Sequence, residues 1–486
     1  MKRLAEIIGD LPTLTVRGDL STLVKDLQYD SRKVTPGDAF VAIRGFQQDG
    51  HAFIPQAYQK GCRVFIVEEI PDIKDAVIVQ VKDTRRWLPF LARNFFGRVA
   101  EQLKIIGITG TNGKTTTAYL LHAILTEAGW KPGLITTVET VIGKERIPAE
   151  RTTPEALDLH RLFYRMYRKK CKSVVMEVSS HALALHRVDG IPFRAAVFTN
   201  LGRDHLDFHK SMGNYFLAKR RLFEHLGQND RAILNLDDPR SRHIMEKTEG
   251  DILTFSMHRP EATTILENYQ MLGDGMSLEL KVPSGKLFCT TSLPGKFNIY
   301  NIMAAVTTAL SLGITEEKIV KGIESVTSIP GRSERFVSPK GFRVYIDYAH
   351  TPEGLQRILE ALLEFQPAHL TVVFGCGGDR DRGKRPIMGK IAEDYADRII
   401  LTNDNPRSED PLNIIEEIKS GIYDTAKVRV IPERKKAIET ALQEAGKNEI
   451  VLIAGKGHEN YQEFADRRIP FDDREVVKSI LEQHKG

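Results

Sequence analysis

The chain has 486 residues, of which 41% are hydrophobic and 27% charged, and its formal net charge is +5. These values predict a soluble globular protein of about three domains. They argue against a nucleic-acid partner, because no dense basic stripe is interleaved with aromatic residues. None of the four cysteines lies in a C-x-x-C pair, which speaks against a zinc site and a disulfide framework. No leader-like or bilayer-spanning apolar run is found, so we expect a cytoplasmic protein without membrane insertion.

Residues 1–100 are predicted to form a small α/β domain. Strand-like runs at 39–43 and 63–67 alternate with helical segments at 54–58 and 87–96. Two polar loops, 29–32 and 45–51, follow the pattern of turns when taken alone.

Residues 105–117 carry the strongest functional signal of the chain. An apolar run is followed by a turn through Gly110 and Gly113, then by Lys114, Thr115 and a helical pattern. Strand, glycine turn and helix start together predict a phosphate cradle in which backbone N–H groups converge on oxyanions. Lys114 would reach the β- and γ-phosphates and Thr115 would hold Mg²⁺. The general pattern has glycine where this chain has Ile108, so a simple linking turn is the alternative.

The second unit, residues 101–331, alternates strands and helices as a doubly wound parallel sheet requires. Polar side chains lie near the carboxyl ends of its strands at 173–178 and 195–200, where ligands bind in such sheets. Among them are Glu177, His181, Asn200, Asp204 and His205. Glu177 suits either a Mg²⁺ ligand or a cap on the next helix, and the residues alone leave both open.

Two further features of this unit have competing interpretations. The helical pattern at 215–223 predicts that Lys219 is an exposed lysine. Asn298 and Asn301 share one helix face, where they could recognise a base or cap the helix start.

The third unit, residues 332–486, begins with the run at 343–350 and repeats the pattern of a buried strand followed by a polar or glycine loop, with further strands at 370–374, 398–402 and 450–454. Arg332, Arg380 and Arg407 offer bidentate forks for carboxylate or phosphate, while Glu459 suits an ammonium group. A phosphate site plus such a domain predicts ATP-driven joining of a carboxylate to an amine through an acyl phosphate.

Six motifs now identify a family resemblance. They lie in one order at 110–116, 177–181, 298–301, 330–332, 347–352 and 455–459. In these motifs and their order, the chain resembles the Mur ligase family of peptidoglycan synthesis, and the resemblance covers nearly the whole chain. Members of that family also lack the first glycine of the phosphate-loop pattern, so Ile108 supports the resemblance. The implied fold is α/β with three domains: a substrate-binding domain, a central P-loop parallel-sheet ATPase domain and a C-terminal Rossmann-like domain.

The resemblance implies ATP and Mg²⁺ as co-substrate and cofactor. ATP would contact Gly110, Thr111, Asn112, Gly113, Lys114, Thr115, Thr116, Asn298, Asn301, Arg332 and Asp347. The metal ligands would be Thr115, Glu177, His205 and Lys219, the last carbamylated and hence anionic. Lys114, Lys219 and His205 would act in catalysis. This assignment of Lys219 reverses the one from the helical pattern.

Within the family the chain resembles the ligases that add meso-diaminopimelate to UDP-N-acetylmuramoyl-L-alanyl-D-glutamate. The nucleotide peptide would contact Ser31, Gln47, Thr152, Thr153, Ser179 and Arg187. The diaminopimelate pocket would comprise Arg380, Asp404, Asn405, Pro406, Arg407, Gly455 and Glu459. Arg407 would pair with the second carboxylate, which lysine lacks. The alternatives are the lysine-adding ligase of the family, folylpolyglutamate synthase and a nucleotide-regulated binding protein. We expect a monomer.

Overall fold

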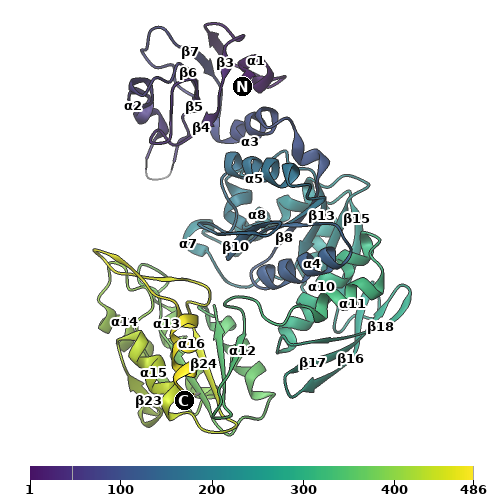
Figure 1. Cartoon of the computed structure of the whole chain (residues 1–486), viewed down its shortest axis with the longest axis vertical. Helices are drawn as coiled ribbons and strands as arrows, with labels where there is room; N and C mark the ends of the chain where they lie inside the picture. The colour runs from purple at the N-terminus through teal and green to yellow at the C-terminus, as the bar shows by residue number, and fades with distance from the viewer. Residues whose placement is uncertain (46–47, 485–486) are drawn as a thin grey trace.

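The computed structural model describes residues 1–45 and 48–484. Figure 1 shows three units arranged along the longest axis of the molecule, with the N-terminal unit at one end and the C-terminal unit at the other. Gln47, predicted to contact the nucleotide peptide, lies outside the described residues.

The N-terminal unit is built on a five-stranded sheet with the strand order β2-β7-β6-β5-β4, parallel except at β2. Its strands are β2 (Thr15–Arg17), β4 (Leu27–Gln28), β5 (Ala39–Val41), β6 (Val64–Val67) and β7 (Val77–Gln80), and β1 (Lys2–Arg3) pairs with β3 (Leu23–Val24). Its helices are α1 (Leu4–Ile8), α2 (Ile54–Gln59) and α3 (Thr84–Phe95), with the 3-10 turn η1 (Gly50–Phe53). The predicted strands and helices of this unit are confirmed. Asp83 begins α3 by accepting a hydrogen bond from Arg86 N.

The central unit contains an 11-stranded sheet with the order β11-β10-β9-β12-β8-β13-β14-β15-β16-β17-β18. The parallel middle comprises β8 (Lys104–Thr109), β9 (Gly133–Ile135), β12 (Ser173–Glu177), β13 (Phe193–Phe198), β14 (Arg231–Asn235) and β15 (Asp251–Ser256). The outer strands, antiparallel to their neighbours except where β16 joins β15, are β10 (Glu139–Ile142), β11 (Glu145–Pro148), β16 (Thr264–Leu272), β17 (Gly275–Val282) and β18 (Gly285–Thr291). The prediction of a parallel sheet is therefore right for the middle and incomplete at both edges.

Helices cover both faces of this sheet, and each face has its own apolar core. One face carries α4 (Lys114–Glu127), α10 (Lys296–Ser311) and α11 (Glu316–Glu324), and the other carries α5 (Ala156–Arg168) and α8 (Met212–Glu224) (Figure 1). The short helix α6 (Ser180–Ala184) packs in the same core as α5 and α8. The short elements η2 (Val99–Gln102), α7 (Leu206–His209) and α9 (Ser241–Met245) complete the unit. Because β8 lies between β12 and β13, the loops after these three strands meet at one edge.

The C-terminal unit has a six-stranded sheet with the order β19-β20-β24-β21-β22-β23, parallel except at β19. Its strands are β19 (Glu334–Val337), β20 (Arg343–Asp347), β21 (Leu370–Phe374), β22 (Arg398–Leu401), β23 (Val428–Val430) and β24 (Ile450–Ala454), and a separate hairpin joins β25 (Tyr461–Glu463) to β26 (Arg468–Pro470). Its helices are α12 (Pro352–Leu363), α13 (Lys384–Tyr395), α14 (Pro411–Lys419), α15 (Arg434–Glu444) and α16 (Asp473–Gln483), with η3 (Thr425–Lys427).

The position of β24 matters for function. This last long strand is inserted between β20 and β21, so the loop that follows it adjoins the loops after β20, β21 and β22. Residues that lie about a hundred positions apart in the sequence thus meet at one edge of the sheet, as in other open α/β sheets. In the described part of the chain, no helix is long and apolar enough to cross a membrane.

Candidate functional site

The loop after β8 has the shape of a phosphate cradle, and its two glycines are required by close packing. Gly110 has φ +149°, and a side chain there would overlap Thr199 Oγ1 at the end of β13. Gly113 has φ +87°, and a side chain there would overlap Asn301 Oδ1 on α10. The loop is also fastened to the next strand end, because Asn112 N donates to Asn200 Oδ1 at 3.0 Å. These contacts fix the backbone of the loop that leads into α4.

Two lysine ammonium groups meet at this loop. Lys114 Nζ donates to the carbonyls of Gly110, at 3.1 Å, and Thr111, at 2.9 Å. Lys219 Nζ, on α8, donates to the same Gly110 carbonyl at 2.7 Å and lies 4.4 Å from the centre of the Tyr215 ring. Burial lowers the pKa of both amines, and for Lys219 the neighbouring Lys114 adds to the shift.

The prediction of an exposed Lys219 from the helical pattern is wrong, since the residue is 1% exposed. Its side chain lies on the face of α8 that packs against the sheet, together with Tyr215 and Leu222. The buried environment suits the chemistry that the family resemblance assigned to this position.

Glu177, at the end of β12, does not cap the following helix. Ser179 does so, by accepting a hydrogen bond from Ala182 N. The Glu177 carboxylate instead accepts from Thr137 N at 3.0 Å and from Thr137 Oγ1 at 3.3 Å. It also lines the cavity beside Thr115. Of the two interpretations left open by the sequence, the helix cap is excluded.

Three histidines lie beside these groups. The His181 and His205 rings are 4.8 Å apart between centroids, and His209 Nε2 lies 2.9 Å from Ser180 Oγ. Burial lowers the pKa of His205 to about 4, although Asp204 at 3.4 Å opposes the shift. Burial likewise lowers the pKa of His209 to about 4. These imidazoles are neutral near pH 7, so they can accept a hydrogen bond or bind a cation.

The two asparagines on α10 form a pair, in which Asn301 Nδ2 donates to Asn298 Oδ1 at 2.9 Å. Both are buried and line the cavity. From the C-terminal unit, Arg332 Nη2 approaches Thr115 Oγ1 at 3.3 Å. Asp347 accepts from the backbone of Ser333 and Ala349, and burial raises its pKa. Residues far apart in sequence thus converge on one volume.

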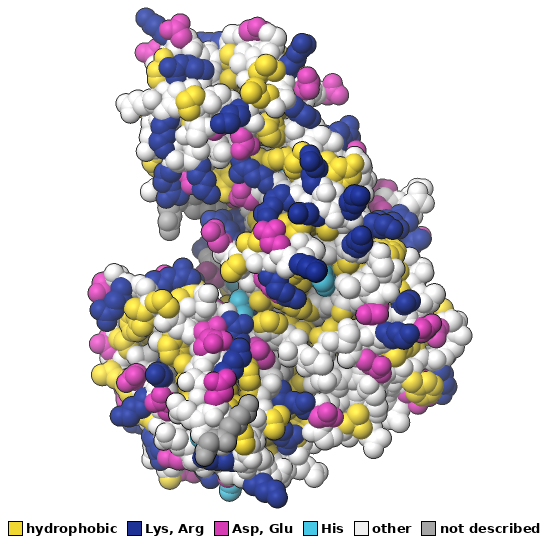
Figure 2. Space-filling model, in the orientation of Figure 1, with side chains coloured by type: hydrophobic (Ala, Val, Ile, Leu, Met, Phe, Trp, Pro, Cys, Tyr) yellow, Lys and Arg dark blue, Asp and Glu magenta, His cyan; other side chains and the backbone are white. Residues whose placement is uncertain are grey.

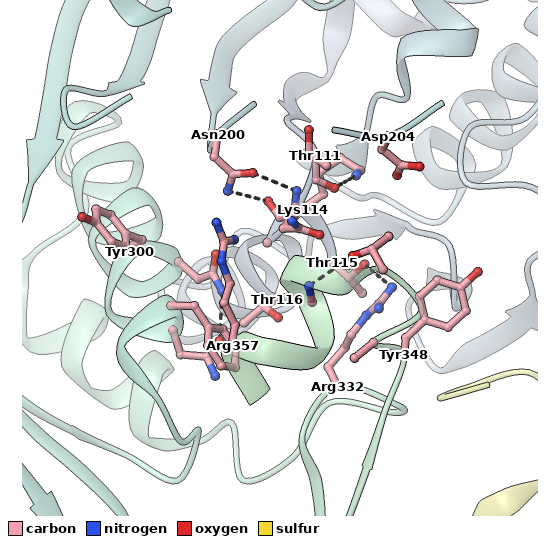
Figure 3. A pocket seen from close by; sticks show the side chains of 18 of the residues that line it. Thr111, Lys114, Thr115, Thr116, Asn200, Asp204, Tyr300, Arg332, Tyr348 and Arg357 are labelled. Carbon is pink, nitrogen blue, oxygen red and sulfur yellow. Dashed lines mark hydrogen bonds between the residues drawn. The ribbon is translucent and has the colours of Figure 1, made fainter. Parts of the chain in front are cut away.

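That volume is a cavity of about 780 Å³ between the central and C-terminal units. Figure 3 shows Lys114, Thr115 and Asn200 on one side and Arg332, Tyr348 and Arg357 on the other. All of the residues predicted to bind ATP line it except Gly110, which lies at the start of the loop. The four predicted metal ligands, Thr115, Glu177, His205 and Lys219, line it as well.

The Mg²⁺ site implied by the resemblance can be tested against these side chains. Among residues 1–45 and 48–484, no three His, Cys, Asp or Glu side chains form a metal-binding group by themselves. Glu177 and Thr115 offer oxygen ligands of the kind that Mg²⁺ prefers. Unmodified Lys219 is a hydrogen-bond donor and fits a metal only after its amine has become an anion. The donor set therefore fits Mg²⁺ with a modified lysine.

Of the residues predicted to bind the nucleotide peptide, the five that the structure describes lie in two places. Four of them surround the end of β12: Thr152, Thr153, Ser179 and Arg187. Thr153 Oγ1 donates to Glu177 O at 2.9 Å, and Arg187 Nη1 donates to Thr153 O at 3.1 Å. Ser31 lies apart in the N-terminal unit, where its hydroxyl donates to Gln56 Oε1 at 2.6 Å. Figure 2 shows a hollow on one face between the N-terminal and C-terminal units.

The residues predicted to bind diaminopimelate cluster at the ends of β22 and β24, outside the lining of the 780 Å³ cavity. Asn405 Nδ2 donates to Glu459 Oε2 at 2.8 Å, and the fully buried Lys456 donates to both residues. Gly455 lies against Asp404, whose Oδ2 would be 2.7 Å from an added side chain. Pro406 O contacts Gly378.

Two arginines border this cluster. Arg407 has a left-handed backbone, with φ +51°, and donates to Gly378 O at 2.7 Å. Arg380 is exposed and donates to Asp379 O at 3.0 Å. The structure therefore brings the predicted pocket together, with Arg380 at its rim.

Several residues of the site were absent from the predicted set. Asn200, Tyr215 and Tyr348 line the cavity, and Lys456 joins Asn405 to Glu459. Asn200 was named as a polar residue at a strand end but was given no ligand, and Lys456 belongs to the motif at 455–459. Tyr348 likewise belongs to the motif at 347–352. The placement of Tyr215 depends on how α8 packs, which no local pattern records.

The fold and the site define a three-domain α/β enzyme in which a P-loop domain faces a Rossmann-like domain across the cavity. The profiles described as Mur ligase family, catalytic domain, as Mur ligase middle domain and as Mur ligase, glutamate ligase domain match residues 24–96, 108–309 and 331–457. The chain belongs to the Mur ligase family, and it is a ligase.

Relatives and solved structures agree with this assignment. The chain is 41% identical over 484 residues to UDP-N-acetylmuramoyl-L-alanyl-D-glutamate--2,6-diaminopimelate ligase 1 of Clostridium acetobutylicum, covering 99% of each chain. It is 44% identical over 465 residues to the ligase of the same description from Solibacter usitatus, covering 95% of this chain and 94% of that one. A solved structure of a ligase so described is 31% identical, with a TM-score of 0.72, and covers 100% of this chain and 99% of that one.

Proposed function

We propose that the chain joins meso-diaminopimelate to UDP-N-acetylmuramoyl-L-alanyl-D-glutamate at the expense of ATP. The names of relatives at 41–44% identity support this substrate pair. From the structure, the observation that carries it is that Arg407, after β22, and Glu459, after β24, lie at the same edge of the sheet, where Asn405 donates to Glu459. Arg407 offers a cation for a carboxylate and Glu459 an anion for an ammonium. The lysine-adding ligase of the family is the alternative, and it would leave Arg407 without a ligand carboxylate.

ATP is assigned to the 780 Å³ cavity, with its phosphates on the loop at 110–116 and its adenosine beside Asn298, Asn301 and Asp347. Lys114 would leave its own loop carbonyls and turn to the phosphates. Arg332, already near Thr115, would add positive charge from the C-terminal unit. The backbone N–H groups at the start of α4 would hold the remaining phosphate oxygens.

The reaction proceeds in two steps. A carboxylate oxygen of D-glutamate attacks the γ-phosphorus of ATP, the bond to the β-phosphate oxygen breaks, and an acyl phosphate and ADP form. The neutral amine of diaminopimelate then attacks the acyl carbon, phosphate leaves and the surplus proton is lost. Positioning and charge stabilisation supply most of the acceleration in such steps. Closure of the two units around the cavity would keep out water, which would otherwise hydrolyse the acyl phosphate.

Lys219 is proposed to be carbamylated. Burial lowers the pKa of its amine well below that of a free lysine, so the neutral, nucleophilic form is populated. The neutral amine attacks the carbon of CO₂ and loses a proton, so that an anionic carbamate replaces the amine. Thr115, Glu177, His205 and the carbamate would then hold Mg²⁺, which would neutralise phosphate charge during transfer.

The nucleotide peptide is assigned to the surface between the N-terminal and central units. Thr152, Thr153, Ser179 and Arg187 would hold its peptide end close to Glu177, and Ser31 with Gln47 would contact the uridine diphosphate. This assignment requires the three units to act together, with boundaries proposed at residues 100 and 331. The protein is proposed to act in the cytoplasm as a monomer, and the four cysteines, all buried and unpaired, agree with a reducing compartment.

Phosphate release measured with all three substrates tests the proposal. We expect release with meso-diaminopimelate at concentrations where L-lysine gives little, and none when the nucleotide peptide is omitted. A preference for L-lysine would assign the chain to the alternative. No release with either amino acid would remove the ligase proposal for these substrates.

A further inference from the structure

Arg407 is held by an acidic side chain from the β25–β26 hairpin. Arg407 Nε donates to Glu463 Oε2 at 3.0 Å, and this ion pair joins residues 56 positions apart. Glu463 is the last residue of β25, and neither the motifs nor the family resemblance assigned it a role. Because Arg407 is the proposed partner of the distal carboxylate of diaminopimelate, its orientation decides which substrate fits.

The backbone fixes the same contact from both sides. Arg407 N donates to Glu463 O at 3.0 Å, and Glu463 N donates to Asn405 Oδ1 at 3.1 Å. Arg407 also forms a parallel bridge with Phe464, while its own φ is +51°. A left-handed conformation in a residue other than glycine persists when surrounding contacts determine it. The hairpin therefore sets both the backbone and the side-chain direction of Arg407.

The contacts leave one part of the guanidinium unused. Nε is taken by Glu463 and Nη1 donates to Gly378 O, whereas among the described residues no oxygen accepts a hydrogen bond from Nη2. A guanidinium has more N–H donors than these two contacts use, and they lie in a rigid plane. Fixing Nε and Nη1 thus fixes where the free donors point.

We propose that Glu463 is a specificity-determining positioning residue, which holds the Arg407 guanidinium so that its free N–H edge receives the distal carboxylate of diaminopimelate. The inference rests on the proposed function. Glu463 acts through Arg407 and is not required to touch the substrate. An amino acid without a second carboxylate gains nothing from the arrangement, so Glu463 should affect the two amino acids differently.

The test compares Glu463→Ala and Glu463→Gln with the wild type in full-length protein. Glu463 is 42% exposed, so both variants are expected to fold, and thermal unfolding checks this. Glu444→Ala is the matched control, because Glu444 forms an ion pair with Arg429 elsewhere in the same unit and is 45% exposed. For each protein, KM and kcat are measured for meso-diaminopimelate, L-lysine, ATP and the nucleotide peptide.

Glu463→Ala should raise KM for meso-diaminopimelate about tenfold, the cost of one misplaced charge-assisted contact. KM for ATP, for the nucleotide peptide and for L-lysine should stay within about twofold of the wild-type values, and so should kcat. A twofold change is smaller than the effect of losing one hydrogen bond. Glu463→Gln, whose amide oxygen can still accept from Nε, should fall between Glu463→Ala and the wild type. Glu444→Ala should match the wild type.

Three outcomes would overturn the inference. A lower KM for diaminopimelate in Glu463→Ala would mean that Glu463 competes with the substrate. An equal rise for ATP or L-lysine would mean a general structural role, and no change in any constant would mean that Arg407 is positioned without Glu463. If the wild type itself rejects diaminopimelate, the proposed function fails and the inference fails with it, whereas the other outcomes leave the proposed function intact.

Discussion

Replacing Gly113 by alanine should damage the nucleotide site more than the fold. At this position φ is +87°, a conformation that costs an alanine about 1–2 kcal/mol. The added methyl group would overlap Asn301 Oδ1 and lie 3.2 Å from Asn301 Cγ. To make room, the loop and α10 must separate or the Asn301 amide must turn away from Asn298, to which it donates at 2.9 Å.

A displacement of about 1 Å in a catalytic loop lowers activity by about a hundredfold. We therefore expect Gly113→Ala to lower kcat/KM for ATP by about that factor in the phosphate-release assay. The midpoint of thermal unfolding should fall only by the amount that the backbone conformation explains, a few degrees.

Gly129→Ala separates the two effects. Gly129 follows the same helix, α4, and has φ +76°, but nothing lies within 4 Å of an added side chain. It should lose similar stability and keep the wild-type kcat/KM for ATP. If Gly113→Ala also kept that value within about twofold, well below the hundredfold expected for a shift of this size, the close approach of Asn301 would not matter to the site.

Three other buried groups yield predictions. Lys219→Met, which cannot form a carbamate, should lower kcat by at least about a hundredfold, as for removal of a charge-stabilising group; wild-type protein given ¹³C-bicarbonate should show a carbamate carbon signal that Lys219→Met lacks, and equal signals would contradict the modification. Burial lowers the pKa of His160 to about 3, so between pH 6.5 and pH 3 the unfolded chain binds a proton at this residue and the folded chain does not. The free energy of unfolding should therefore fall as the pH is lowered through this range, by about 2 kcal/mol at pH 5. In urea unfolding, His160→Phe should reduce this loss. Arg434 and Asp473 are fully buried and form a bidentate pair at 2.8 Å, so Arg434→Met should cost about 3–5 kcal/mol of unfolding free energy, while Arg434→Met with Asp473→Leu should recover most of it; equal losses in the single and double variants would refute the explanation.

Local patterns predicted the elements that carry the site. The strand at 370–374 and the strand at 450–454 were predicted with the observed bounds, because their apolar runs are short and end in polar or glycine loops. The phosphate loop followed from its glycines and Lys114. The antiparallel strands at the sheet edges were not predicted, since their pairing depends on neighbours that the parallel pattern does not specify.

Side-chain environments were harder to predict than elements. Lys219 has the residue type of an exposed position, yet the turn of α8 places it on the buried face, beside the carbonyl of Gly110. The ion pair of Arg407 with Glu463 joins two loops through a hairpin that no motif includes. In both cases tertiary contact decides the chemistry, and only the family resemblance pointed to the function of Lys219.

In the proposed reaction, the linker between the central and C-terminal units would connect the two chemical steps. Gly331 has φ +65°, and a side chain there would overlap the backbone N of His458, in the loop that carries Glu459. Its carbonyl accepts from Tyr348 N at 3.0 Å, in the loop that lines the ATP cavity. The next residue, Arg332, reaches Thr115 on the phosphate loop. A rotation at this linker would therefore move the amine pocket and the ATP contacts together, so that closing the cavity over ATP also brings the amine toward the activated carboxylate.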